Sequence, residues 1–282
     1  MRVLVAGAAG QLGRTIVDAF APQHDVTALT HQQLDICDTQ AVAAAMSAAR
    51  PDVIINCSAN NQVDGAEDAP LPALTVNAWG PRILARAAAG AGAVFVHYST
   101  DFVFDGDAAV PYTETDAPRP RSTYGISKLL GEWFAAEAPR HYVLRVESLF
   151  GGANARSSID ALLNAILSGD EARAFSDRVV SPSYVDDVAA ATVALLTRGA
   201  PAGLYHCVNS GSATWLDVTR ELARLADRPN ARITAVSVDE VKLRAARPKY
   251  AALSNAKLRA AGIAMPTWQD ALARYVPARA LS

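Results

Sequence analysis

A glycine-rich junction near the N-terminus constrains the fold more than any other feature. The segment VLVAGAAGQLGRTIVDAF, residues 3–20, starts as an apolar strand and ends in a helical pattern, with Gly7, Gly10 and Gly13 between them. A strand that turns sharply into a helix points the helix's free N–H groups and positive end toward the turn, where a diphosphate can bind. Glycine permits the tight turn and the close approach of backbone to phosphate. The spacing GxxGxxG in a first βαβ unit therefore predicts a dinucleotide site rather than an ordinary tight turn.

The first 150 residues alternate short apolar runs with helical patterns. The runs are nearly continuous in apolar residues, as in strands that helices cover on both faces, and the alternation predicts a doubly wound parallel sheet. Residues 105–122, with three prolines and several acids, predict a long functional loop. The predicted strands are Arg2–Ala6, Asp25–Leu29, Val53–Asn56, Val94–Tyr98 and Tyr142–Val146. The predicted helices are Gln11–Phe20, Thr39–Ala49, Leu74–Ala89 and Thr123–Ala138.

Beyond residue 150 the alternation becomes less regular. A helix near Ser158–Leu167, a strand at 203–208, a helix from Thr214, a strand at 233–238 and a last helix from Trp268 are expected. We therefore predict an α/β, Rossmann-like fold with a smaller C-terminal α/β lobe. Residues 1–150 form the dinucleotide-binding domain, and residues 151–282 mainly form the substrate lobe, with some segments returning to the Rossmann core.

Charge and composition exclude several classes of protein. The 26 basic and 28 acidic residues give a net charge of −2, which leaves no basic surface typical of nucleic-acid binding. No apolar run approaches the roughly 20 residues that span a bilayer, and the N-terminus does not resemble a signal peptide. Cys37, Cys57 and Cys207 form no CxxC pair, so reduced thiols and a cytoplasmic location are expected. No cluster of histidine, cysteine and carboxylate has the spacing of a metal site, so no metal is predicted.

A second motif combines a tyrosine, a lysine and two hydroxyl groups at the end of a strand. In YGISK, Tyr124 and Lys128 lie four residues apart, on one face of a helix, and the strand VFVHYSTD ends in Ser99 and Thr100. Ketone reduction needs a hydride on carbon and a proton on oxygen. A tyrosine with its ordinary pKa of about 10 holds its proton firmly, and a nearby ammonium group lowers that pKa. Lys128 is expected to act in this way on Tyr124, and Thr100 is expected to bind the substrate oxygen.

These motifs resemble those of the extended short-chain dehydrogenases/reductases, and in particular the dTDP-4-dehydrorhamnose reductase family. The resemblance extends over nearly the whole chain, through LDICD (34–38), PDVIINCSANNQVDGAED (51–68), VHYSTDFVFDG (96–106), YGISKLLGE (124–132), SPSYVDDVA (181–189), GLYHCVNSG (203–211) and RPKYAALSNAKL (247–258). It implies reduction, with NADPH or NADH, of the C4 ketone of a nucleotide-linked 4-keto-6-deoxy sugar. It allows a homodimer.

The resemblance also assigns roles to single residues. The catalytic residues it implies are Thr100, Tyr124 and Lys128. The cofactor-binding residues it implies are Gly7, Gly10, Gln11, Leu12, Gly13, Arg14, Ile36, Asp38, Ser58, Ala59, Tyr124 and Lys128. The substrate-binding residues it implies are Val63, Asp101, Phe102, Ser148 and Arg247. Arg247 either contacts the diphosphate of the sugar nucleotide or braces the two lobes.

Two segments depart from the family pattern. The family usually reads RTSWVYG after the fifth strand, and this chain reads RVESLFG, so Glu147 and Ser148 replace a small hydroxyl residue and a tryptophan. The polar residues 60–62, Asn-Asn-Gln, replace a His-Thr-Ala or Tyr-Thr-Ala sequence. Both segments line the sugar pocket in the family, so the sugar is left open.

A few positions bear on the choice between NADP(H) and NAD(H) and on two alternative functions. The second strand ends in Leu29–Thr30–His31 without the acid that binds an NAD ribose, and Arg14 follows the last glycine, which together favour NADP(H) over NAD(H). A dehydratase or epimerase of the same branch is one rival, and dehydratases place an Asp-Glu pair where this chain has Asp101–Phe102. A non-catalytic regulatory subunit, resembling that of methionine adenosyltransferase, is the other.

Overall fold

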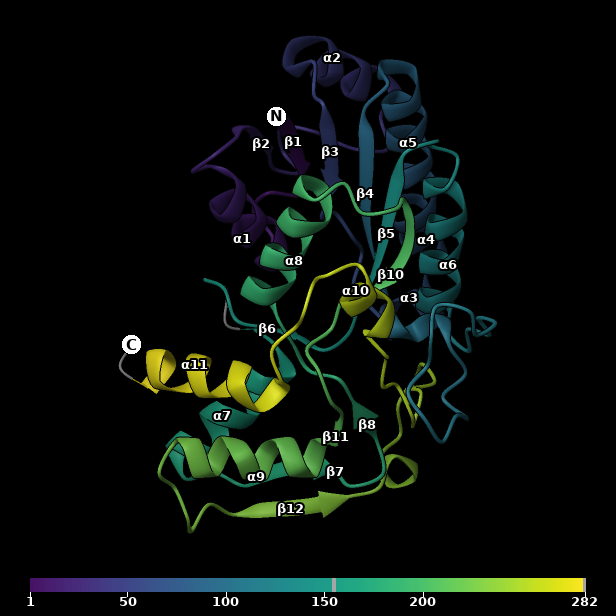
Figure 1. The fold of residues 1–282 in the computed structure, drawn as a ribbon. Helices are drawn as coiled ribbons and strands as arrows, with labels where there is room; N and C mark the ends of the chain where they lie inside the picture. The colour runs from purple at the N-terminus through teal and green to yellow at the C-terminus, as the bar shows by residue number, and fades with distance from the viewer. Residues whose placement is uncertain (154–155, 281–282) are drawn as a thin grey trace.

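The computed structural model describes residues 1–153 and 156–280, and its largest element is a six-stranded parallel sheet (Figure 1). The strand order is β10-β5-β4-β3-β1-β2. Since β2 and β3 lie on opposite sides of β1, the direction of winding reverses there. Sheets of this type bind ligands beyond the carboxyl ends of the strands at such a reversal. The strands are β1 (Arg2–Ala6), β2 (Asp25–Leu29), β3 (Val53–Asn56), β4 (Val94–Thr100), β5 (His141–Val146) and β10 (Gly203–His206).

Helices cover both faces of this sheet because its strands are apolar on both. Along β1, Val3 and Val5 belong to a core cluster with α1 and α8, whereas Leu4 and Ala6 belong to a cluster with α2, α5 and α6. The first face carries α1 (Gln11–Phe20) and α8 (Val185–Thr197), and the second carries α2 (Thr39–Ala49), α5 (Gly80–Ala91) and α6 (Thr123–Ala135). Short elements between them are α3 (Gly65–Asp68), α4 (Pro70–Leu74), η1 (Thr75–Trp79) and η2 (Asp101–Val103).

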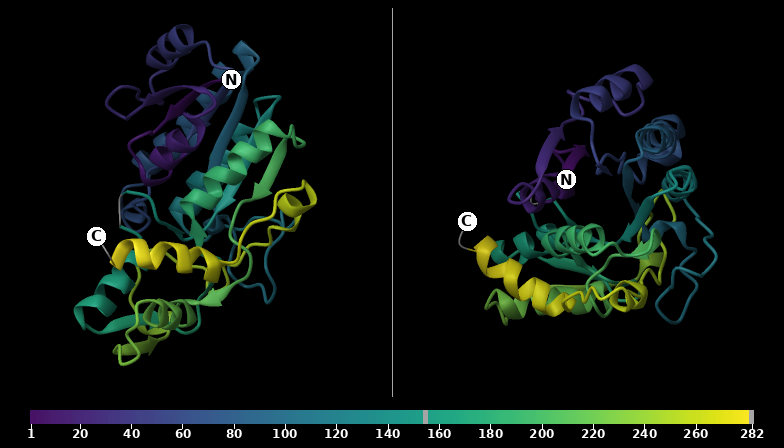
Figure 2. Two further views of the ribbon diagram at one scale, coloured as in Figure 1. Left: turned by 60° about the vertical axis from the view of Figure 1, so that its left-hand side comes forward. Right: turned by 45° about the horizontal axis from the view of Figure 1, so that its top comes forward.

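A separate core lies below the sheet in the view of Figure 1, where α7, α9 and α11 pack around short strands. This cluster is called the lower core. Leu163, Leu222 and Leu272 are buried in this core, and the rings of Phe150, Tyr184 and Tyr275 contact one another. Both views of Figure 2 show α11, in yellow, beside these lower elements. The elements are β6 (Leu149–Phe150), α7 (Ser158–Ser168), β7 (Ala172–Phe175), β8 (Val179–Val180), β9 (Ser183–Tyr184), β11 (Ala213–Thr214), α9 (Trp215–Leu225), β12 (Ile233–Val236), η3 (Val238–Glu240), α10 (Ala256–Ala260) and α11 (Trp268–Ala280).

The predicted fold class is confirmed, and so are the five strands of the first 150 residues. The predicted helix at 74–89 is interrupted, because η1 is a wider π-type turn in which the Gly80 N–H donates to the Thr75 carbonyl. Pro81, which cannot donate a backbone hydrogen bond and crowds the carbonyl four residues earlier, accounts for this wider turn. Residues 105–122 contain no named helix or strand.

The division at residue 150 stays a prediction. β10 and α8 come from beyond it and belong to the layers of the central sheet. Residues 154–155 and 281–282 of the predicted second lobe lie outside the described residues. Within the described ranges, no helix is both long and apolar enough to cross a membrane, and no three metal-ligating side chains gather in one place.

Candidate active site

The turn after β1 leaves no room for side chains at two of its glycines. Gly7 has a φ of +75°, and a Cβ there would lie 2.7 Å from the Ser58 backbone nitrogen. A Cβ on Gly13 would lie 2.2 Å from the Gly7 carbonyl oxygen. Gly10 is the N-cap of α1, which has no side-chain cap and no acid in its first turn. The first N–H groups of α1 therefore remain available for an anion, and this cradle fits a diphosphate.

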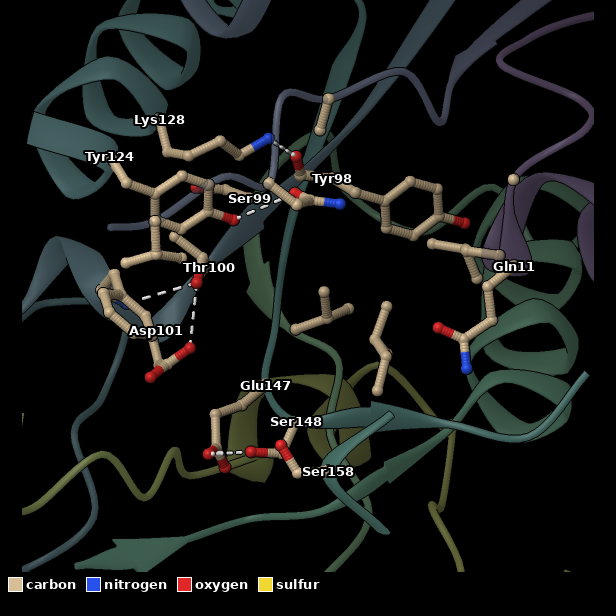
Figure 3. A pocket seen from close by; sticks show the side chains of 18 of the residues that line it. Gln11, Tyr98, Ser99, Thr100, Asp101, Tyr124, Lys128, Glu147, Ser148 and Ser158 are labelled. Atoms are coloured by element: carbon tan, nitrogen blue, oxygen red, sulfur yellow. Dashed lines mark hydrogen bonds between the residues drawn. The ribbon is translucent and has the colours of Figure 1, made fainter. Parts of the chain in front are cut away.

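Two adjoining cavities flank the glycine turn. The first, of about 470 Å³, lies beyond the carboxyl ends of β3, β4 and β5 (Figure 3). The second, of about 420 Å³, lies toward the connection between β2 and α2. Both volumes are typical of small-molecule sites. The residues that line both cavities are Gly10, Cys57, Ser58, Ala59 and Asn61. The other predicted residues that line the first cavity are Gln11, Leu12, Val63, Thr100, Asp101, Phe102, Tyr124, Lys128, Ser148 and Arg247.

Helix α6 delivers Tyr124 and Lys128 to the first cavity. The Ser122 hydroxyl caps the start of this helix by accepting a hydrogen bond from the Gly125 N–H, at 3.1 Å. A Cβ on Gly125 would lie 2.3 Å from the Phe102 carbonyl oxygen, so the glycine lets α6 lie directly against η2. The Phe102 and Tyr124 rings meet edge to face, with centroids 5.5 Å apart. Figure 3 shows the Tyr124 hydroxyl and the Lys128 ammonium group on the same side of the helix.

The environment of Tyr124 differs from the sequence-based expectation. Lys128 Nζ donates to the Tyr98 carbonyl oxygen at 2.6 Å, and the Tyr124 hydroxyl lies 3.4 Å from Asn61 Oδ1. Burial and the negative charge of Asp101 raise the pKa of Tyr124 above its usual value, although a hydrogen bond with Thr100 opposes this shift. Burial has the largest effect on this pKa and acts in the opposite direction to the effect expected of Lys128, whose influence on Tyr124 stays a prediction. Burial also lowers the pKa of Lys128, to about 8.

Thr100 and Asp101 stand at the end of β4. Thr100 Oγ1 donates to Asp101 Oδ1 at 2.9 Å and accepts a hydrogen bond from the Phe102 N–H at 3.3 Å. Asp101 is only 3% exposed, and its Oδ2 has no hydrogen-bond partner among the described residues. Burial raises the pKa of Asp101 to about 6, and the charge of Arg178 partly offsets this effect.

A buried ion pair between β5 and α6, joined by a hydrogen bond from β4, links these three elements. Arg145 of β5 donates to Glu132 of α6 through Nε at 2.8 Å and through Nη2 at 2.7 Å. Ser99 Oγ donates to the same carboxylate at 2.5 Å. All three side chains are buried. Since breaking a buried pair of this kind is costly, the network holds the strand end with Thr100 against the helix with Lys128.

On the β2 side, the predicted cofactor residues have different environments. Ile36 lines the second cavity with Gly7. Asp38 is the N-cap of α2, and its carboxylate accepts from the Gln40 and Ala41 N–H groups at 2.8 and 3.1 Å. Arg14 is exposed on α1, and neither it nor Gly13 nor Asp38 lines either cavity. The roles of these residues stay predictions.

Arg247 is held at the edge of the first cavity. Its Nη2 donates to Asp64 Oδ2 at 2.8 Å, and its Nη1 donates to the Ala245 carbonyl oxygen at 3.0 Å. Its guanidinium carbon lies 5.7 Å from the centre of the Phe102 ring, and that of Arg178 lies 5.8 Å from the same ring. The structure thus gives Arg247 a bracing contact with Asp64 and a place at the cavity, and its contact with a diphosphate stays a prediction.

Several lining residues were not assigned to the site from the sequence. Arg178 belongs to no motif, and only the fold brings it to the cavity, so no sequence signal pointed to it. Glu147 and Asn61 were visible as departures from a family pattern, which was the available signal. Ser158 and Trp215 lie at the starts of α7 and α9 and enter the cavity from the lower core.

Known proteins similar to this chain include enzymes that act on nucleotide sugars. A protein of Streptomyces antibioticus named probable dTDP-4,6-dihydroxy-2-methyloxan-3-one 4-ketoreductase is 36% identical over 98% of this chain and 95% of its own length. The dTDP-4-dehydrorhamnose reductase of Streptomyces griseus is 35% identical over 98% and 93%. A crystal structure of dTDP-4-dehydrorhamnose reductase from Bacillus anthracis, in complex with NADP, superposes with a TM-score of 0.93 at 31% identity, over 98% of this chain and 99% of that one. The family model described as the RmlD substrate binding domain matches residues 1–280, and the chain belongs to that family.

Proposed function

We propose that this protein reduces the C4 ketone of a dTDP-linked 4-keto-6-deoxy sugar, with NADPH as the reductant. The observation that carries the proposal is the meeting of Thr100, Tyr124 and Lys128 at one cavity beside a glycine cradle that has no room for side chains. The names of the relatives support the same reaction class. When bound, the reduced nicotinamide supplies a hydride to the carbonyl carbon.

The cradle and the two cavities provide the proposed cofactor site. The residues proposed to hold the phosphates and the rest of the dinucleotide are Gly7, Gly10, Gln11, Leu12, Gly13, Ile36, Ser58 and Ala59, with Tyr124 and Lys128 at the nicotinamide end. Asp38 acts indirectly in this proposal, because its cap fixes the start of α2. The exposed Arg14 and the absence of an acid at Leu29–His31 favour NADP(H) over NAD(H).

Tyr124 is the proposed proton donor to the carbonyl oxygen. Its raised pKa keeps the phenol protonated at neutral pH, so that the proton is present to be given. Thr100 Oγ1 is proposed to hydrogen-bond the same oxygen and to stabilise the charge that develops on it. The ammonium group of Lys128, with a pKa of about 8, is mostly charged at neutral pH and would favour the phenolate that remains.

The substrate is proposed to bind in the part of the first cavity that faces the lower core. Val63, Asp101, Phe102 and Ser148 line the part of the first cavity that would receive the sugar. Arg247 would reach the diphosphate, since a guanidinium group matches phosphate oxygens with paired donors. In this proposal residues 1–150 hold the cofactor and contribute these four residues to the sugar pocket, whereas residues 151–282 mainly serve to hold the rest of the substrate.

A direct assay tests the proposed reaction. We expect purified protein mixed with dTDP-4-keto-6-deoxyhexose to consume NADPH, and to consume it faster than NADH, as measured by the absorbance of the reduced cofactor. The product should be the 4-hydroxy sugar nucleotide. Tight NADPH binding without turnover of any such keto sugar would instead support the regulatory-subunit alternative.

We also propose that the protein forms a homodimer through the outer faces of η1 and α6. Trp79, Ile126 and Trp133 are 49%, 45% and 61% exposed, which is unusual for large apolar side chains. Ile126 and Trp133 lie seven residues apart, on the same side of α6, and Trp79 packs against Phe134 of that helix. We expect sedimentation velocity to give about twice the monomer mass, and Trp133→Glu to shift the protein to monomer. A monomeric wild type would refute this proposal.

We propose a cytoplasmic location. The three cysteines, Cys37, Cys57 and Cys207, are free thiols, as expected in a reducing compartment. Fractionation of the producing cells would test this location.

A further inference from the structure

Two buried carboxyl groups lie next to each other at the end of the central sheet. Thr100 of β4 pairs with Val146 of β5 in the parallel register, so Asp101 and Glu147 directly follow the ends of two adjacent strands. Neighbouring strands are only about 4.8 Å apart. Both side chains line the first cavity, and they are only 3% and 2% exposed.

The hydrogen bonds of this pair are incomplete. Glu147 Oε1 accepts from the Ser148 hydroxyl at 2.7 Å (Figure 3), and Glu147 Oε2 accepts from the Ser181 backbone N–H. Asp101 Oδ1 accepts from Thr100, whereas Oδ2 is buried without a partner among the described residues. Leaving a buried acceptor unpaired costs stability, which is commonly tolerated where a ligand completes the bond.

The charges of the pair are also incompletely balanced. Arg178 is a cation that acts on both carboxyl groups, and burial outweighs its effect on each of them. Burial and the neighbouring Asp101 raise the pKa of Glu147 well above its usual value. The two carboxyl groups therefore favour a shared proton or a bound hydrogen-bond donor, and Asp101 Oδ2 remains an unpaired acceptor at the cavity.

We propose that Glu147, together with Asp101, determines substrate specificity by binding a hydrogen-bonding ring substituent of the sugar, either a hydroxyl or an ammonium group. This inference rests on the proposed function and names a property of the substrate. A hydroxyl or an ammonium group can donate to Asp101 Oδ2 and hydrogen-bond the Glu147 carboxyl group, and an ammonium group can also take the place of the shared proton. A sugar without such a substituent leaves these buried groups unpaired, which a site of this kind discriminates against.

The test compares matched sugars and matched variants. With saturating NADPH, kcat and KM are measured for dTDP-4-keto-6-deoxyhexose, for its 2-deoxy and 3-deoxy forms, and for the corresponding amino sugars. We expect the wild type to prefer one hydroxylated or amino sugar over its deoxy form by about tenfold in kcat/KM. In Glu147→Leu this preference falls to within about twofold. Glu147→Gln keeps it if the substituent is a hydroxyl and loses it if the substituent is an ammonium group.

Three controls separate specificity from folding and from the reaction. The melting temperature and the Kd for NADPH report whether each variant is folded, and Glu171→Leu removes an exposed carboxylate that lines neither cavity. Glu147→Leu with an unchanged preference, or equal losses on all sugars, would show that Glu147 is only structural. Calorimetric binding of the reduced 4-hydroxy sugar nucleotides measures the same preference without turnover. Selective binding without any turnover would overturn the proposed reaction and leave the inference standing.

Discussion

The Tyr124→Phe variant is expected to reduce the keto sugar about a thousandfold more slowly than the wild type, with a far smaller change in the Kd for NADPH. The substitution removes only the hydroxyl that is proposed to donate a proton, and general acid catalysis of this kind contributes roughly 10²- to 10⁴-fold. The phenylalanine ring keeps the edge-to-face contact with Phe102. The initial rate of NADPH consumption under saturating substrate measures the effect.

The melting temperature is the control for this variant, because it shows whether the fold is kept when only the hydroxyl group is removed. The Tyr124 side chain is 8% exposed, so its replacement by phenylalanine leaves a well-filled site, and an unchanged melting temperature is expected to accompany the loss of turnover. A rate within about threefold of the wild type would mean that another group, such as the buried acid Asp101, supplies the proton.

The catalytic part of the site could be read from the sequence because its residues are close together in the chain. Tyr124 and Lys128 lie one helical turn apart, and Thr100 ends a strand whose apolar run is unmistakable. Arg178 could not be found in this way, because its approach to the cavity depends on how the lower core packs on the sheet. The direction of the pKa shift of Tyr124 also could not be predicted from the sequence, since it depends on burial and on the adjacent Asp101.

The same distinction explains the fold. Most strands of the central sheet contain an apolar run, and the bounds of β1, β2 and β3 match the predicted ones, whereas those of β4, β5 and β10 differ by one or two residues. The lower core instead contains two-residue strands such as β6, β8, β9 and β11, which are too short to show an alternation of apolar and polar residues in the sequence. The wide turn at η1 was missed because a helical pattern continues through it, and only the hydrogen bond from Gly80 to Thr75 reveals the extra residue.

Gly13→Ala is expected to weaken NADPH binding by about 5- to 100-fold. A Cβ at this position would lie 2.2 Å from the Gly7 carbonyl oxygen and 3.1 Å from the Ala8 Cα, which are both backbone atoms. Backbone cannot rotate away as a flexible side chain can, so the turn between β1 and α1 must open. Forced overpacking costs about 1–3 kcal/mol or more, and each 1.4 kcal/mol changes an affinity about tenfold. Quenching of protein fluorescence by NADPH measures the Kd.

Gly90→Ala is the matched control, because it makes the same chemical change where there is space for it. Gly90 lies within α5, and a Cβ there would meet nothing within 4 Å. Alanine is also the better helix former by about 1 kcal/mol, so this variant should bind NADPH normally and melt at or above the wild-type temperature. If Gly13→Ala bound NADPH as tightly as Gly90→Ala does, the turn would not be the cradle for the diphosphate, and the cofactor would have to bind elsewhere.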